Sequence, residues 1–114
     1  MEHILGELNK TSDVVGSFIV AEDGIIVASD LQSEIDAEMI GALISSVIRA
    51  SRQTVDKMEY GDVKNFMLEA EKNKIFFARC KFGFLVIVTG PEANLGLIRV
   101  EARNAVKKLE GIAL

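Results

Sequence analysis

The sequence predicts a mixed α/β fold of the α+β type, in which a five-stranded antiparallel sheet is sandwiched by one long helix on one face and two terminal helices on the other. One observation behind this prediction is the order of the periodic segments, α-β-β-α-β-β-β-α. Another is that the last predicted strand is apolar on both faces, with Phe84 and Val86 on one and Leu85 and Ile87 on the other. Both faces therefore need covering, and the helices must be divided between them.

The length and composition are those of one globular domain. The 114 residues are 49% hydrophobic and 26% charged, which is enough apolar content to bury a core. We therefore expect residues 1–114 to form a single domain. The net charge of −4 favours solubility and argues against a broad surface for the phosphate backbones of nucleic acids.

The first half of the chain predicts a helix, a hairpin and a long helix. Apolar residues at helical spacing indicate a short helix over residues 2–11. Two apolar runs, residues 16–21 and 25–29, are joined by Glu22-Asp23-Gly24, where Asp-Gly supplies the positive φ that a tight hairpin turn requires. A long periodic stretch from about residue 36 to residue 58 then predicts the principal helix of the fold.

The second half predicts three strands and a closing helix. Gly61-Asp62 interrupts the helical pattern, and the linkers that follow are of hairpin length. The strands are expected over residues 63–69, 75–80 and 84–89. Gly90-Pro91 ends the last strand, and residues 95–110 resume a helical pattern with Gly111 as the expected C-cap.

The apolar side of the long helix is wider than one sheet face requires. Its apolar positions spread over about half the circumference, against a stripe of ~100° for packing on one sheet. Small residues along its flanks would let a second helix approach closely, so a symmetric partner with an identical helix is the simplest explanation. The alternative is a monomer whose helix lies in a deep groove of its own sheet. The expected dimer interface comprises Gly41, Ile44, Ile48, Val55, Asn65 and Met67.

The strand over residues 63–69 has the alternation of an edge strand. Phe66 and Leu68 lie on one face, whereas Asn65 and Glu69 are among the residues on the other. Its free backbone groups would be guarded or would join a partner's strand, which would extend the sheet across a dimer.

The inventory for catalysis is poor. His3 is the only histidine and Cys80 is the only cysteine. Neither G-x-x-x-x-G-K-[ST] nor G-x-G-x-x-G, the two glycine-rich motifs that bind nucleotide phosphates, occurs in the sequence. We therefore expect no enzyme activity and no cofactor. Cys80 lies in an apolar alternation, which favours a small core residue over a reactive thiol. The sequence has no apolar run long enough to cross a membrane, and its first residues, MEHILGELNK, do not resemble a secretion signal. We therefore expect a cytoplasmic protein without direct membrane insertion.

One acidic cluster precedes the long helix. Glu34, Asp36 and Glu38 could bind a hard cation, but carboxylates near a helix N-terminus are explained by its dipole, so we expect no metal site. Ser33 or Asp36 is the expected N-cap of this helix.

The polar side of the long helix holds the candidate binding residues. A solvated face explains such residues without any function, and a docking surface for an acidic or polar partner is the alternative. The candidates are Ser45, Arg49, Arg52, Gln53 and Asp56.

Three segments resemble the roadblock/dynein light chain family over essentially the whole chain. They are GSFIVAEDGIIVASD with the amphipathic helix that follows it, the three strands ending in FGFLVIVTG, and the last helix NLGLIRVEARNAVKKL. The resemblance implies a roadblock/profilin-like sheet and dimers formed through the long helix and the middle strand. It also implies the regulation or scaffolding of Ras-like small GTPases, as in the similar prokaryotic MglB proteins, which stimulate GTP hydrolysis by reshaping the GTPase's own site.

These observations predict a homodimeric regulator or scaffold that binds a Ras-like small GTPase. An arginine finger from Arg49 or Arg52 is a further option. Two alternatives stay open at this point: a structural assembly subunit with no effect on nucleotide turnover, and a small-ligand sensor with a defined polar pocket.

Overall fold

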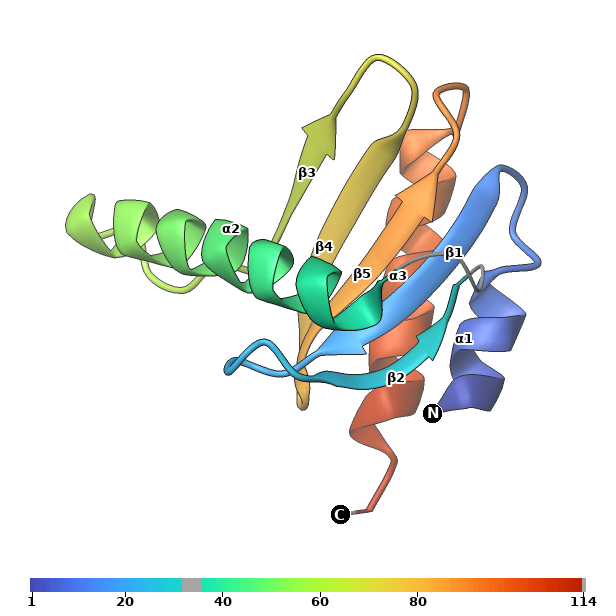
Figure 1. The fold of residues 1–114 in the computed structure, drawn as a ribbon, viewed down its shortest axis with the longest axis horizontal. Coiled ribbons are helices and arrows are strands. Elements are labelled where there is room, and N and C mark those ends of the chain that lie inside the picture. Colours follow the sequence, from blue (N-terminus) through green and yellow to red (C-terminus); the bar gives the residue numbers. More distant parts are fainter. Residues whose placement is uncertain (32–35, 114) are drawn as a thin grey trace.

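The structure is a computed structural model that describes residues 1–31 and 36–113. The elements of this described part follow the predicted order, which is confirmed together with the fold class (Figure 1). They are α1 (Glu2–Leu8), β1 (Val14–Val20), β2 (Ile26–Asp30), α2 (Ala37–Lys57), β3 (Asn65–Glu69), β4 (Lys74–Cys80), β5 (Gly83–Thr89) and α3 (Leu95–Glu110).

The first helix is shorter than the predicted 2–11, and Asn9 explains where it ends. The Asn9 side-chain amide donates a hydrogen bond to the backbone oxygen of Asp30 at 3.0 Å, and its oxygen accepts one from the Ser17 hydroxyl at 2.7 Å. These bonds tie the residue that follows α1 to β1 and β2. Because β1 begins at Val14, two residues earlier than predicted, little room is left for a longer helix.

The strands of the sheet have the order β2-β1-β5-β4-β3, and every neighbouring pair is antiparallel. β5 is central, with β1 on one side and β4 on the other, so the first and last strands are interior as predicted. β3 lies at an edge, which was also predicted, although it begins at Asn65 and not at residue 63.

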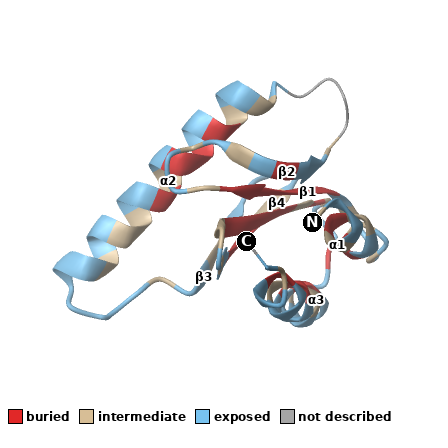
Figure 2. Cartoon of the chain, turned by 90° about the horizontal axis from the view of Figure 1, so that it is seen from below, coloured by how far each residue is buried: buried red, intermediate tan, exposed pale blue. Residues whose placement is uncertain are grey.

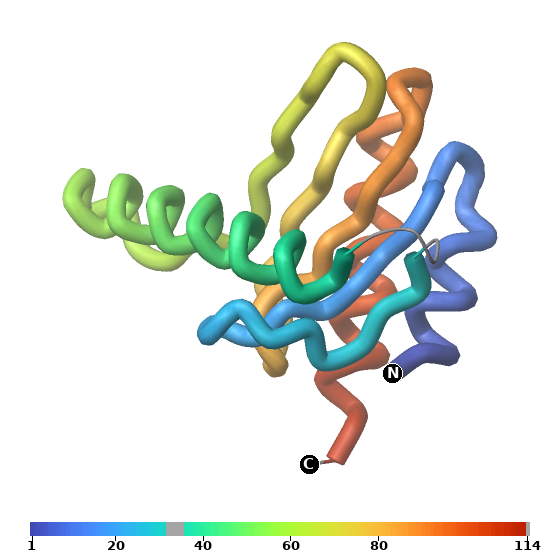
Figure 3. The backbone as a smooth tube through the Cα atoms, in the orientation of Figure 1, coloured from blue at the N-terminus to red at the C-terminus, as the bar shows by residue number. Residues whose placement is uncertain are grey.

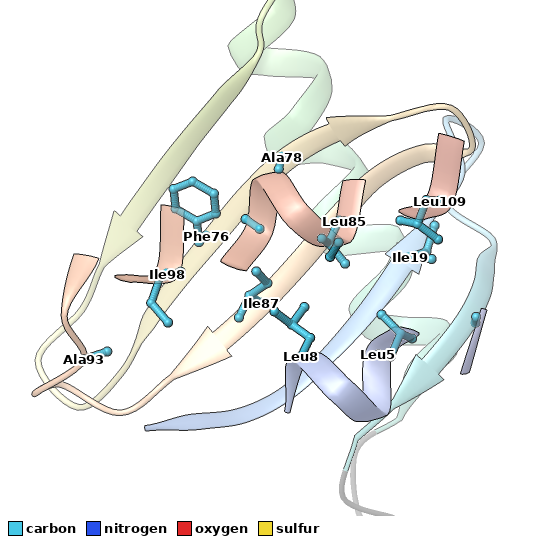
Figure 4. Close-up of a cluster of buried hydrophobic side chains, with 13 residues drawn as sticks. Leu5, Leu8, Ile19, Phe76, Ala78, Leu85, Ile87, Ala93, Ile98 and Leu109 are labelled. Atoms are coloured by element: carbon cyan, nitrogen blue, oxygen red, sulfur yellow. The ribbon is translucent and has the colours of Figure 1, made fainter. Parts of the chain in front are cut away.

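Two layers of helices cover the two faces of the sheet. Figure 2 shows α2 on one face and α1 with α3 on the other, and the tube in Figure 3 follows the chain from the N-terminus in α1 to the end beyond α3. On the α1/α3 face, Leu5 and Leu8 of α1 and Ile98 and Leu109 of α3 pack against the sheet (Figure 4). Burial of these side chains, at about 1.5–3 kcal/mol each, holds both helices in place.

The α2 face has its own apolar core. Ile44 and Ile48 of α2 are buried in a cluster with Phe18 of β1 and Val86 of β5. Phe77 of β4 completes this cluster toward the β3 edge and stacks on the ring of Phe66, with 4.3 Å between ring centroids.

The helix ends follow the sequence signals that lie within the described residues. The Asp36 carboxylate caps α2 by accepting a hydrogen bond from the backbone N–H of Met39 at 3.2 Å. The other predicted cap, Ser33, and Glu34 of the acidic cluster lie outside the described residues. Asn94 caps α3 in the same way, and Gly111 is its C-cap as predicted.

A glycine pair sets how closely α2 approaches the β1–β2 hairpin. Gly24 has a φ of 90°, which fits the predicted turn. A Cβ atom at Gly41 would overlap the backbone oxygen of Gly24 and approach Ile26. Gly41 therefore lets α2 sit directly against the turn.

We predict opposite effects for two Gly-to-Ala substitutions in helices. Gly41→Ala should lower the free energy of unfolding by about 1–3 kcal/mol, because the clash with the turn exceeds the gain in helix propensity. Gly6→Ala is the matched control, since a Cβ there meets only the Asp30 carboxylate at 3.8 Å, and it should raise the free energy of unfolding by ~0.5–1 kcal/mol. Urea unfolding at one fixed protein concentration measures both. Equal effects would contradict the close-approach explanation.

Candidate functional site

The candidate site is the surface of α2 that the sheet leaves open. α2 crosses its face of the sheet, and its C-terminal end extends past the β3 edge (Figures 1 and 2). Met58 follows this end with 53% of its area exposed, and Tyr60 is 73% exposed. The helix therefore carries apolar groups to a place where its own sheet does not cover them.

The residues predicted for a dimer interface differ in burial: some are buried in their own chain, some are half-buried and one is exposed. Gly41, Ile44 and Ile48 are buried against the hairpin and the sheet of their own chain, and Val55 is half-buried on the same side of α2. Their part in an interface stays a prediction.

The two interface residues predicted on β3 also differ from each other. Asn65 is exposed, whereas Met67 is half-buried against the cluster on the α1/α3 face. The backbone edge of β3, more than these side chains, is what the strand offers to a partner.

The exposed apolar flank of α2 is built from other residues. We define it as Met39 and Leu43, which are 55% and 58% exposed, together with exposed Ala50. Half-buried Ile40 and Val47 connect this flank to the core beneath. The sequence shows that apolar residues cover about half of the circumference of the helix. Which of these residues face the sheet depends on the direction in which the helix crosses the strands.

The polar flank of α2 lies on the side of the β1–β2 turn. We define it as Ser45, Arg49 and Arg52 with Glu22 of the turn. An Nη atom of Arg49 donates to the Ser45 hydroxyl at 2.6 Å, which itself donates to the backbone oxygen of Glu22 at 3.5 Å. Arg52 forms an ion pair with the Glu22 carboxylate at 2.8 Å. The structure thus brings together three of the five predicted binding residues.

The remaining two predicted residues border a small hollow beside this flank. Gln53 and Asp56 line it together with Arg52 and with residues 61–63 of the connection to β3, and its volume is about 260 Å³. That is below the ~300 Å³ at which ligand pockets usually begin. A single side chain of a partner protein would fit such an opening.

Glu22 is the participant that sequence reasoning missed. The sequence assigns a turn to Asp23 and Gly24, which follow Glu22. No pattern in the sequence connects Glu22 with Arg52, which lies 30 positions later in the long helix. The close approach of Gly41 to the turn and the hydrogen bond from Ser45 to Glu22 lie beside the ion pair of Glu22 with Arg52.

The groups considered for chemistry lie apart from this surface. His3 is exposed on α1, and Cys80 is half-buried at the end of β4. Burial raises the pKa of the Cys80 thiol above its ordinary value, although backbone hydrogen bonds from Phe82 and Gly83 partly oppose this. The neutral thiol is therefore favoured, which agrees with the core role expected from the sequence.

The part of the chain that the structure describes offers little for metal, membrane or small-ligand binding. Within residues 1–31 and 36–113, no group of at least three His, Cys, Asp or Glu side chains is placed to hold a metal ion. No helix of that part of the chain is long and apolar enough to cross a membrane. Among the same residues, every buried side-chain polar atom has a hydrogen-bond partner, so no such group is left for a small ligand to satisfy.

Comparisons with known proteins agree with this architecture. The Roadblock/LC7 domain model matches residues 1–89, which include α2 and its surface. Two proteins of Methanocaldococcus jannaschii, MJ1340 and MJ0310, are each 35% identical over 112 residues, covering 98% of this chain and 98% of theirs.

Solved structures show the same fold at lower identity. A Roadblock/LC7 domain from Streptomyces avermitilis superposes with a TM-score of 0.88 at 18% identity, covering 96% of this chain and 94% of that one. MglB of Myxococcus xanthus also gives 0.88, at 20% identity, with 94% and 89% covered. These structures show a shared fold, and the family model, which matches most of the chain, shows that the chain belongs to the Roadblock/LC7 domain family.

Proposed function

We propose that this protein is a homodimeric regulator or scaffold that binds a Ras-like small GTPase through the surface of α2. The observation that carries the proposal is the position of α2: one side covers the sheet, an apolar flank stays exposed, and the C-terminal end extends beyond β3. The implied role of the family supplies the class of partner.

The surface area of one chain supports self-association. The accessible area is 7037 Å², whereas a compact monomer of 12.5 kDa has roughly 6,200 Å². The excess of roughly 800 Å² fits a chain whose α2 extends past its own sheet and leaves area for a partner to cover. If two sheets joined edge to edge at β3, the extending end of α2 would lie over the partner's sheet and cover Met58 there.

A relative of the same fold also supports an assembly of several copies. A solved structure of MglB has a tetrameric arrangement and superposes on this chain with a TM-score of 0.83 at 14% identity. Self-association is thus compatible with this fold.

The polar and apolar flanks of α2 allow two partners at once. Leu43 and Arg52 are nine positions apart, which at about 100° per residue places them on opposite sides of the helix. A second copy on the apolar flank would therefore leave the polar flank accessible to the GTPase. This arrangement suits a protein that presents one surface to itself and another to its target.

The contacts of the arginines favour a positioning role over a catalytic one. Arg52 is held by Glu22, and Arg49 is held by Ser45 and Ser46. An arginine finger must instead reach into the nucleotide site of the GTPase. We therefore assign the catalytic groups for GTP hydrolysis to the GTPase, with this protein stabilising their active arrangement and performing no catalysis of its own.

We predict a dimer that a charge on the apolar flank dissociates. Sedimentation at micromolar concentration should give a dimer for the natural protein and a folded monomer for Leu43→Glu, because a carboxylate would have to be desolvated in the interface. Val100→Glu on α3 is the matched control, since Val100 is similarly exposed in the other layer, and it should remain dimeric. A natural protein that stays monomeric at every concentration overturns the dimer.

We predict that a GTPase partner recognises the arginines of the polar flank. Small GTPases from the same organism should co-elute with the protein, and the double variant Arg49→Ala/Arg52→Ala should bind about tenfold more weakly. Its free energy of unfolding should change by no more than ~1 kcal/mol, because the ion pair is exposed.

The control for this binding experiment is Arg99→Ala/Arg103→Ala, which removes the same charge from α3. Binding with faster GTP hydrolysis supports regulation. Binding without a change in rate supports the alternative of an assembly subunit, and no binding to any GTPase removes the proposal.

A further inference from the structure

A second candidate surface lies in the other layer, between α3 and the β3–β4 side of the sheet. It is a groove of about 230 Å³ on the face opposite α2. Five of its lining residues are cationic, and we call it the basic groove: Lys64, Arg79, Arg99, Arg103 and Lys107. Its floor is apolar, with buried Ala78 and Ala102 and half-buried Val106 (Figure 4 shows Ala78 beneath α3).

The cations of α3 form a row along one side of the helix. Arg99, Arg103 and Lys107 recur every four residues, so they span about 12 Å on neighbouring turns. Like charges at this spacing weaken a helix by a few tenths of a kcal/mol per pair. A chain with a net charge of −4 has thus collected positive charge at one place.

Few carboxylates balance this charge. Asp62 forms an ion pair with Arg79 at 3.2 Å, with both side chains largely exposed. Within the described part of the chain, Lys64 and the three cations of α3 form no ion pair. Glu110 ends the row on α3 but does not line the groove, and Glu101 lines a separate hollow between α1 and α3.

The groove combines a cationic rim with an apolar floor, and this combination defines its ligand. We propose that the basic groove binds an acidic segment of a partner protein, whose carboxylates pair with the row on α3 while an apolar side chain rests on Val106. Guanidinium groups suit carboxylates because they donate two parallel hydrogen bonds.

The same features disfavour other anions. Single-stranded nucleic acids need exposed aromatic rings for base stacking, and the only aromatic side chain of the groove, Phe76, is buried in its floor. A membrane-binding helix needs a continuous row of exposed large apolar groups beside its cations. On α3 the exposed large apolar side chains are Leu97 and Val100, both in its first half, whereas Ala102 and Val106 face the sheet cluster.

This site is separate from the proposed GTPase surface on α2, although Asn65 of its lining also belongs to the predicted dimer interface. All its lining residues belong to one chain, and the sheet separates it from α2. The protein would then hold an acidic segment on one layer while α2 contacts its own partners on the other.

The test measures fluorescence anisotropy of a short labelled peptide that alternates Glu and Leu. The natural protein should bind it, with affinity that falls as salt is raised. The variant Arg99→Glu/Arg103→Glu should bind about tenfold more weakly. The matched control Lys10→Glu/Lys72→Glu changes the net charge equally at exposed positions away from the groove and should bind like the natural protein.

Three further probes identify the ligand class: a peptide without Leu, single-stranded RNA and phosphatidylglycerol vesicles. A peptide in which Ser replaces Leu should bind more weakly, because it leaves the floor of the groove uncovered. Circular dichroism and sedimentation of the same samples distinguish a loss of binding from unfolding or from loss of the dimer. If Arg99→Glu/Arg103→Glu does not fold, Arg99→Gln/Arg103→Gln takes its place. Absence of peptide binding, equal loss in the control variant, or tighter binding of single-stranded RNA or phosphatidylglycerol vesicles overturns the proposal.

Discussion

The need to keep water from both faces of β5 governs this structure. Phe84 and Val86 on one face and Leu85 and Ile87 on the other are almost completely buried at the centre of the sheet. Such a strand requires a layer of helices on each side, because neither face can be left to solvent. The two layers differ, however: α1 and α3 share one face, whereas α2 lies alone on the other. The functional surfaces follow from this inequality.

A single helix on a wide sheet must serve the core with one side and leave the rest to other contacts. Gly41 fixes its position by allowing direct contact with the β1–β2 turn, which in turn brings Glu22 to Arg52. That position leaves the apolar flank on the opposite side, beginning at Met39 and Leu43. The same packing constraint therefore separates a polar surface from an apolar one on α2, and each has its own kind of partner in the proposed function.

The sequence predicts those features that depend on local periodicity, and it fails where distance in space decides. Element order, the interior place of β1 and β5 and the caps Asp36 and Gly111 follow from spacing and turn chemistry. Which side of α2 meets the sheet depends on its crossing direction, so the sequence alone did not show that Ile44 packs in the core of its own chain. The sequence does not predict the basic groove for the same reason, because Lys64 and Lys107 are far apart along the chain and lie together only when α3 packs on the sheet.

The row of cations on α3 opposes the stability of the helix that carries it. Arg99 and Arg103 repel each other, and so do Arg103 and Lys107. Only Lys107, in the last turn, is favoured there. The fold needs Ala102 and Ala105 on the buried side of α3, but it needs no charge on the side toward the groove. An arrangement of charges that destabilises its own helix is typical of a binding site. An acidic ligand would replace the repulsion between these cations with attraction to its carboxylates.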